Sequence, residues 1–224
     1  MRPKGIIIAI DGPTASGKST TAREVAKQLG YIHINTGAMY RAFALYASQW
    51  GVDLSSDERV PELAEKVYID FDESGNILLE GRDVNKEIQA PEIAQLASEL
   101  ATLPIVREKM VALQQEIGKE GGAVLDGRDI GTVVFPDAEL KIFLIANAKT
   151  RDERRKEELA LTGNGISLEK LTKEIEERDR RDSEREYSPL KKGNDAVELD
   201  TSKLTIEEQV EMVVKLSKKV ISSK

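Results

Sequence analysis

The chain contains no cysteine and a single histidine, His33, among its 224 residues. Without cysteine the protein has no disulfide, no thiolate nucleophile and no Cys-ligated zinc. One histidine is too few for a metal centre built from several imidazoles. The short apolar run around His33 predicts a strand, so we interpret this histidine as a strand residue without a ligand role.

The chain also lacks an excess of positive charge and a long apolar segment. It carries 33 Lys and Arg against 40 Asp and Glu, a net charge of -7. This balance argues against a large binding surface for DNA, RNA or an anionic membrane. The apolar run near the N-terminus, Ile6–Ile10, is too short for a signal sequence or a membrane span. We therefore expect a cytoplasmic protein without nucleic-acid or membrane partners. We also expect a monomer, although charge and hydropathy do not bear on the oligomeric state.

The most informative stretch is IIIAIDGPTASGKST, residues 6–20. Its apolar half predicts a buried parallel strand, and the rest fits the phosphate-loop pattern G-x-x-x-x-G-K-[ST]. A chance match is the alternative, but the preceding strand and following helix are the context that the motif requires. In such a loop Lys18 reaches the β and γ phosphates, and the Ser19 hydroxyl binds Mg²⁺. The residues expected to bind ATP are Gly12, Pro13, Thr14, Ala15, Ser16, Gly17, Lys18, Ser19 and Thr20, together with Arg154 farther along the chain.

Strand and helix patterns alternate along most of the chain, which predicts an α/β fold with a parallel sheet covered on both faces. A different pattern lies between residues 52 and 104. Alternation over 67–71, turn residues at 73–76 and the run 77–79 predict an antiparallel hairpin. An antiparallel piece inside a strand-helix series indicates an inserted lobe.

Asp126-Gly127-Arg128-Asp129 follows directly after the apolar strand 123–125. Carboxyl ends of parallel strands open onto the ligand crevice, so these charges should lie on the side of the phosphate loop. Asp126 is placed to hold Mg²⁺, directly or through water, and Arg128 to reach a phosphate. The alternative is a turn with its own internal Arg-Asp pair.

The helix expected from Leu168 carries an apolar stripe that continues into charged residues, Arg178, Asp182 and Arg185. Burying arginine without a partner is costly, so this face makes sense beside an anionic ligand. A solvated helix end with Arg-Asp pairs is the alternative.

Capping boxes predict the start of two helices in the second half of the chain, one at Thr150 and Glu153 and one at Thr205 and Glu208. The first of these helices is expected to end at Leu161, before a Gly-Asn-Gly break at 163–165, and it carries Arg151, Arg154 and Arg155. Guanidinium groups that close over a transferring phosphoryl group would stabilise its charge, which suggests a lid. Pairing on the helix surface is the competing interpretation. Arg41, Arg128 and Arg185 together call for a second phosphate besides that of ATP, and hence for a phosphorylated acceptor.

These motifs resemble those of the bacterial cytidylate kinases, a family of nucleoside monophosphate kinases. The resemblance rests on IDGPTASGKST, NTGAMYR at 35–41, LDGRDIGTVVFPDA at 125–138, KIFL at 141–144 and ERDRRDSER at 177–185. It implies a core with a five-stranded parallel sheet, residues 1–36 and 105–224, with a lid at about 151–167. It further implies an inserted lobe for the nucleoside monophosphate, residues 37–104, with a small antiparallel sheet.

The resemblance also implies phosphoryl transfer from ATP to CMP or dCMP, with Mg²⁺. Arg41, Arg128 and Arg185 would bind the acceptor phosphate, Arg178 and Asp182 the sugar, and Ser98, Arg107 and Asp129 the cytosine. Thr36, a position usually occupied by serine in the family, would bind substrate through its hydroxyl. The residues expected to act in catalysis are Lys18, Arg128, Arg154, Arg155 and Arg185. Other P-loop kinases of UMP/CMP, adenylate or shikimate type, and a nucleotide-dependent regulatory module, are the alternatives.

Overall fold

The computed structural model describes residues 2–51, 58–72, 75–161 and 168–223, and it divides into two compact units. The first unit comprises Met1–His33 and Glu120–Lys224, and the second comprises Ile34–Lys119. In the described residues no helix combines the length and apolar character needed to cross a membrane.

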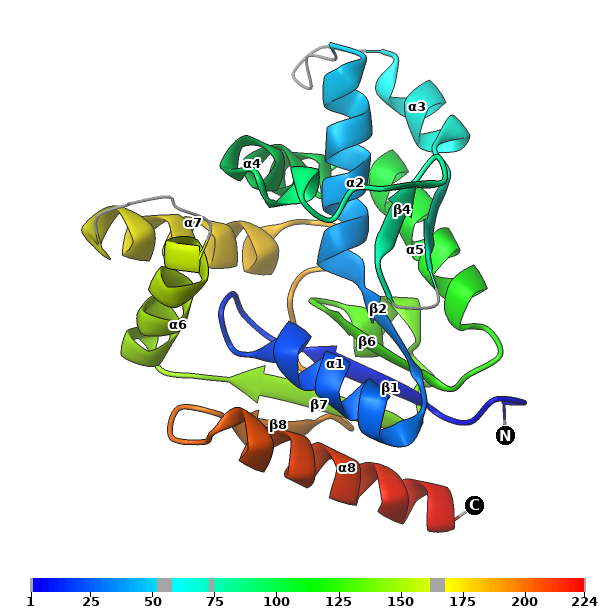
Figure 1. Ribbon diagram of the computed structural model, residues 1–224, viewed down its shortest axis with the longest axis vertical. Coiled ribbons are helices and arrows are strands. Elements are labelled where there is room, and N and C mark those ends of the chain that lie inside the picture. Colours follow the sequence, from blue (N-terminus) through cyan, green and yellow to red (C-terminus); the bar gives the residue numbers. More distant parts are fainter. Residues whose placement is uncertain (1, 52–57, 73–74, 162–167, 224) are drawn as a thin grey trace. The chain divides into compact units, whose positions relative to one another are not determined.

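A five-stranded sheet organises the first unit, with the order β2-β6-β1-β7-β8 (Figure 1). Its strands are β1 (Ile7–Asp11), β2 (Ile32–Asn35), β6 (Ala123–Gly127), β7 (Leu140–Ile145) and β8 (Val197–Asp200). The central strand β1 pairs in parallel with β6 and β7, and Asp11 stands opposite Gly127. The phosphate loop and the segment after β6 therefore leave the sheet side by side. The predicted α/β class with a parallel sheet is confirmed.

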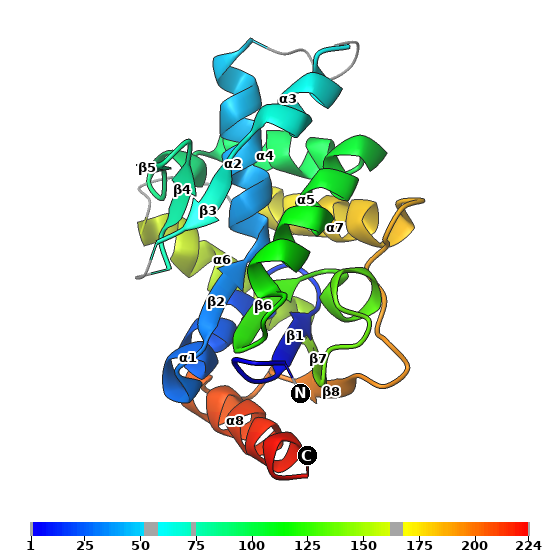
Figure 2. The same ribbon diagram turned by 90° about the vertical axis from the view of Figure 1, so that its right-hand side faces the viewer.

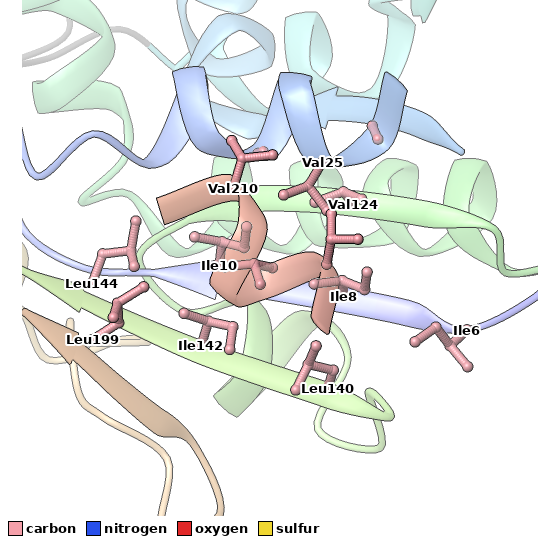
Figure 3. Packing of buried hydrophobic residues seen from close by; sticks show 14 residues of the cluster. Ile6, Ile8, Ile10, Val25, Val124, Leu140, Ile142, Leu144, Leu199 and Val210 are labelled. Atoms are coloured by element: carbon pink, nitrogen blue, oxygen red, sulfur yellow. The ribbon is translucent and has the colours of Figure 1, made fainter. Parts of the chain in front are cut away.

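Apolar side chains from the sheet pack against α1 (Lys18–Leu29) and α8 (Ile206–Ser222). Figure 3 shows Ile8, Ile10 and Ile142 of the strands facing Val25 of α1 and Val210 of α8. The four apolar residues of β1 are buried, as the apolar run predicts, and Asp11 at the end of the strand is buried as well. This core fixes the end of β1, from which the phosphate loop starts.

The remaining helices of the first unit carry the charged motifs. They are α6 (Ala148–Leu161), α7 (Leu168–Glu184) and the short π-helical turn η2 (Ile130–Val134). The predicted capping box at Thr205 and Glu208 is present on α8. The one predicted for α6 is wrong, because Asn147 Oδ1 accepts the Thr150 N–H at 2.9 Å. The predicted Gly-Asn-Gly break at 163–165 lies outside the described residues.

The second unit combines helices with a three-stranded sheet (Figure 2). Its elements are α2 (Thr36–Gln49), α3 (Val60–Lys66), β3 (Ile69–Phe71), β4 (Ile77–Leu79), β5 (Arg82–Asp83), η1 (Glu87–Gln89), α4 (Pro91–Leu100) and α5 (Pro104–Gly118). The antiparallel hairpin of β3 and β4 is confirmed, and β5 extends it. The compact unit includes α5, whereas the lobe expected from the sequence ended at residue 104.

Candidate functional site

The phosphate loop, residues Gly12–Lys18, bends sharply between β1 and α1. Gly12 has φ 148°, and a Cβ there would lie 2.2 Å from the backbone oxygen of Leu144, so only glycine fits. Gly17, also at positive φ, precedes the first turn of α1. The loop backbone therefore ends at a helix N-terminus, the arrangement that binds phosphate oxygens.

Lys18 is buried and lies folded over the loop. Its Nζ donates to the Pro13 carbonyl oxygen at 2.5 Å and to Ser16 Oγ at 3.4 Å. Burial holds the pKa of Lys18 well below its usual range, and the positive charge of Arg128 acts in the same direction. An anionic phosphate would favour the charged form, so the binding of a phosphate would stabilise the protonated lysine.

Thr201, which follows the edge strand β8, and Arg154, on α6, lie beside the phosphate loop. The buried Thr201 hydroxyl contacts the backbone oxygens of Ser16 and Ile145, each at 3.0 Å. Arg154 donates to Thr201 Oγ1 at 3.0 Å and to the Thr201 carbonyl at 2.8 Å. Arg154 Nη1 lies 3.5 Å from the point that a Cβ on Gly17 would occupy. The structure thus places Arg154 beside the loop, and burial lowers its pKa.

Asp126, at the end of β6, links the loop helix to the histidine. The Ser19 hydroxyl donates to Asp126 Oδ2 at 2.5 Å, and His33 Nε2 lies 2.7 Å from Asp126 Oδ1. Burial raises the pKa of Asp126, but hydrogen bonds from His33 and Ser19 outweigh it and hold the pKa below its usual range. The strand position of His33 agrees with our prediction, and its contact with this carboxylate was not foreseen.

Ser19 and Asp126 fit the expected Mg²⁺. Magnesium in nucleotide enzymes is usually held by one or two protein oxygens together with substrate phosphates and water. The Ser19 hydroxyl and an ionised Asp126 oxygen are adjacent here. Among the described residues no group of three or more His, Cys, Asp or Glu side chains could enclose a metal ion. The donors present therefore suit an ion carried mainly by the nucleotide.

Arg128 and the charged end of α7 form one cluster. Arg128 Nε donates to Asp182 Oδ2 at 2.7 Å, and Arg128 Nη2 donates to the Thr14 hydroxyl at 3.1 Å. Arg185 lies 3.5 Å from Asp182 and 3.7 Å from Asp129. Arg128 pairs across 54 residues with α7, so the alternative of an internal pair within its own turn does not describe this segment.

Charge balance governs the titration of this cluster. Burial pushes the pKa of Asp182 upward, but the charges of Arg128, Arg178 and Arg185 outweigh burial and hold it below its usual range. Burial likewise lowers the pKa of Arg128, and Asp182 more than restores it. The cluster is therefore a set of largely buried arginines around Asp182, with Asp129 also close to Arg185. The alternative of Arg-Asp pairing on α7 partly anticipated it.

Asp179 joins α7 to the tip of the phosphate loop. Its Oδ1 accepts the Thr14 N–H at 2.8 Å, and its Oδ2 accepts a hydrogen bond from Arg151 Nη1. Arg151 Nη1 also lies 3.4 Å from the Thr14 carbonyl oxygen. The competing interpretation, pairing on the surface of its own helix, is thus wrong for Arg151, because its partner Asp179 lies on α7. Arg155 lies half-buried on the same helix, α6.

The second unit holds four predicted substrate residues. Thr36 is buried at the start of α2, whose N-cap Asn35 accepts the Ala38 N–H, and Arg41 lies on the same helix. Ser98 is buried on α4. Arg107, on α5, is 3% exposed, donates to the Ala101 carbonyl at 3.2 Å and stacks 5.7 Å from the Tyr40 ring centre. A buried arginine over an aromatic ring provides a fixed planar donor.

The first unit thus brings together the loop, Ser19 with Asp126, and Arg128 with Asp182, Arg185 and Asp129. Sequence reasoning missed Asp11, Asp179, Thr201 and Gln209, which contact the loop or the segments next to it. Asp11 had a usable signal, because it is a polar residue at the carboxyl end of a buried strand. Gln209 Oε1 accepts from the Thr21 hydroxyl at 2.9 Å, a contact over 188 residues that no local pattern shows.

Comparison with known proteins identifies the family of the chain. The family model described as cytidylate kinase matches residues 8–219. A cytidylate kinase of Bacillus cereus (strain B4264) is 49% identical over 216 residues, covering 95% of this chain and 96% of that protein. One of Bacillus anthracis (strain CDC 684 / NRRL 3495) is 49% identical over 214 residues, covering 94% and 95%.

Solved structures agree at the level of the fold. An uncharacterized protein from Eubacterium ventriosum matches with a TM-score of 0.50 and 15% identity, covering 99% of this chain and 100% of that chain. TT1252 from Thermus thermophilus matches with a TM-score of 0.50 and 16% identity, covering 96% and 97%. The family model and the close relatives span nearly the whole chain, and the chain belongs to the cytidylate kinase family.

Proposed function

We propose that this nucleoside monophosphate kinase transfers the γ-phosphoryl group of ATP to CMP or dCMP with the residues described above. The observation that carries the proposal is the position of Arg128. Its guanidinium contacts Thr14 of the phosphate loop on one side and Asp182 on the other. A cationic group between the donor loop and a second cluster of arginines suits a reaction that joins two phosphates.

The transfer requires alignment and charge stabilisation more than proton transfer. The acceptor phosphate is already an oxyanion at neutral pH, so it needs no histidine base. Lys18 and Arg128 would stabilise the charge that spreads over the transferring group, and Arg154 and Arg155 would add to it from α6. Arg185 and Arg41 would hold the acceptor phosphate, with bidentate geometry that suits guanidinium groups.

Mg²⁺ would be held by Ser19 and Asp126, and when bound it would neutralise phosphate charge. The hydrogen bond between His33 and Asp126 leaves the carboxylate oriented toward Ser19. Ligating carboxylates are commonly oriented by such outer partners. The loop residues Gly12–Thr20 would bind the ATP phosphates.

For the nucleoside, we propose that Asp182 and Arg178 bind the sugar and that Ser98, Arg107 and Asp129 bind the cytosine. Thr36 would bind substrate through its hydroxyl. Asp129 can accept a hydrogen bond from the cytosine amino group, whereas uracil would present a carbonyl oxygen to that carboxylate. A site built for a hydrogen bond rejects a ligand that cannot make it, because a buried group is left unpaired.

We also propose how the chain is divided into domains and where in the cell the protein acts. Residues 37–104 would act as the nucleoside monophosphate lobe of a core made by 1–36 and 105–224, with residues 151–167 as the lid. We expect a cytoplasmic monomer that acts on small-molecule nucleotides without nucleic-acid or membrane partners. Another P-loop kinase specificity is the second candidate, and the presence of Asp129 beside Arg185 favours cytidylate over it.

A coupled assay of ADP release over a panel of nucleoside monophosphates tests the function. We expect ADP release with CMP and dCMP and much slower release with UMP, AMP and GMP. ATP turnover that is unaffected by CMP would instead identify a nucleotide-dependent regulatory module. Equal rates with UMP and CMP in the wild type would refute the role of Asp129.

A further inference from the structure

Asp11, the last residue of β1, binds two backbone groups of the segment that follows β6. Its Oδ1 accepts the Ile130 N–H at 2.8 Å, and its Oδ2 accepts the Gly131 N–H at 2.8 Å. The carboxylate is 5% exposed. Ile130 and Gly131 begin η2, where backbone N–H groups have no partner within the helix. Asp11 therefore fills the role of a cap for a helix that is remote in sequence.

The two residues before η2 are Arg128 and Asp129, and both belong to the proposed site. The carbonyl oxygen of Asp129 accepts the Val133 N–H at 2.8 Å, so the backbone of Asp129 is part of the turn that Asp11 caps. Arg128 leaves the same segment toward Thr14. A shift of the η2 backbone would therefore move the side chains of both residues.

Asp11 is also the residue directly before Gly12. Its backbone is fixed by pairing with β6 and β7, opposite Gly127 and Phe143. The position of Gly12 is tightly determined too, because its α-carbon approaches the Leu144 carbonyl. One residue thus joins the first residue of the phosphate loop to the segment that carries Arg128 and Asp129.

A carboxylate at this position is costly, which argues that its geometry matters. Burial raises the pKa of Asp11 to about 6, and the two N–H groups only partly offset burial. Asparagine would avoid the charge, but its side chain accepts with one atom and would turn an NH₂ group toward the other N–H. Two acceptors side by side are needed, and only a carboxylate supplies them.

We propose that Asp11 is a positioning residue for phosphoryl transfer, which holds the Arg128–Asp129 segment in register with the phosphate loop. The inference rests on the proposed function, since Arg128 and Asp129 act there on the acceptor. Both oxygens of the Asp11 carboxylate accept from backbone N–H groups, and the side chain is buried. Its loss should therefore affect the acceptor more than ATP, and should lower the preference for CMP over UMP.

The test compares Asp11→Asn with Glu139→Gln as a matched control. Glu139 Oε2 accepts the Ile7 N–H at 2.8 Å, so it is a carboxylate bound to the backbone of the same strand, at the opposite end. The measurements are kcat and KM for ATP and CMP, the CMP to UMP ratio of kcat/KM, and hydrogen exchange of residues 128–134. All are made well below the melting temperature of each variant.

For Asp11→Asn we expect kcat/KM for CMP to fall about 10- to 100-fold, the effect of a displacement on the order of 1 Å in a reaction that depends on alignment. The CMP to UMP ratio should fall, and KM for ATP should stay within about threefold, because the loop contacts Thr201 and Asp179 remain. Exchange at 128–134 should become about tenfold faster. Glu139→Gln should change none of these values beyond about twofold, whatever its effect on stability.

Asp11→Ser is the second variant, for use if Asp11→Asn does not fold. A serine hydroxyl has one oxygen where the carboxylate has two, so it cannot accept from both the Ile130 and the Gly131 N–H as Asp11 does, and the effect should be in the same direction. Unchanged CMP kinetics and selectivity in the folded variant would overturn the proposal. Hydrogen exchange does not depend on the substrate, so it distinguishes a failure of the proposed function from a failure of the role of Asp11. A wild type inactive toward CMP refutes the proposed function, and unchanged exchange at 128–134 refutes the role of Asp11.

Discussion

Replacing Lys18 with methionine should lower activity and raise the stability of the ligand-free protein at the same time. The activity loss follows from the removal of one preorganised charge at the transferring phosphate. Such a loss is on the order of 10²–10³ in rate, or about 2.7–4 kcal/mol of transition-state stabilisation. Methionine keeps most of the volume of the lysine side chain, so it removes the charge with little change in packing.

The gain in stability follows from the surroundings of Lys18. The ammonium group is buried, it contacts the Pro13 carbonyl, and the charge of Arg128 lies near enough to lower its pKa further. A buried charge that is poorly compensated costs free energy of folding, and its replacement by an apolar residue of similar volume often stabilises by about 1–4 kcal/mol.

The pH dependence has a definite sign. The folded pKa of Lys18 lies below its unfolded value, so the charged side chain destabilises the folded state. That cost is relieved as the pH rises from the lowered folded pKa toward the ordinary lysine value. The stability advantage of Lys18→Met should therefore be largest below the folded pKa and shrink as the pH rises through this range.

The assays are urea unfolding of the ligand-free protein between neutral and alkaline pH, and initial rates of ADP release with saturating ATP and CMP. Lys27→Met is the matched control, because Lys27 is exposed on the same helix, and it should change both quantities little. An activity within a few-fold of the wild type would remove Lys18 from the mechanism. A clear loss of stability in Lys18→Met would refute the argument from burial.

Two further predictions concern the carboxylates of the first unit. Asp182→Asn should destabilise the protein by about 3–5 kcal/mol in urea unfolding, because Arg128 and Arg185 lose their buried counter-charge; a loss below about 1 kcal/mol would contradict this. Because the pKa of Asp182 is lowered in the folded state, the ionised carboxylate stabilises the wild type. This stabilisation should be lost as the pH falls through the folded pKa of Asp182. His33→Leu should weaken the Mg²⁺-dependent stabilisation by ATP in thermal unfolding, and it should reduce the rate of ADP release about tenfold or more. His33→Gln keeps a hydrogen-bond donor for Asp126, so it should retain most of this stabilisation and most of the rate. Equal behaviour of the two His33 variants would show that this hydrogen bond does not orient Asp126.

Much of the fold could be predicted because its signals are local. The strand before the phosphate loop, the helix that ends at Gly30 and the capping box at Thr205 each depend on residues within one or two turns. Predictions failed where a local pattern had a competitor. Thr150 and Glu153 satisfy the capping-box spacing, but Asn147 begins α6 three residues earlier, and the Thr150 hydroxyl donates instead to the Ser202 carbonyl.

The sequence by itself determined the phosphate loop, because glycines, lysine and serine at fixed spacing build it from one continuous segment. It also determined which arginines and aspartates are available. Only the tertiary structure decided how they pair. Arg128 with Asp182, Thr14 with Asp179, and Asp11 with Gly131 are separated by 54, 165 and 120 residues. Such contacts depend on strand order and on the direction of each side chain, and no spacing along the chain encodes them.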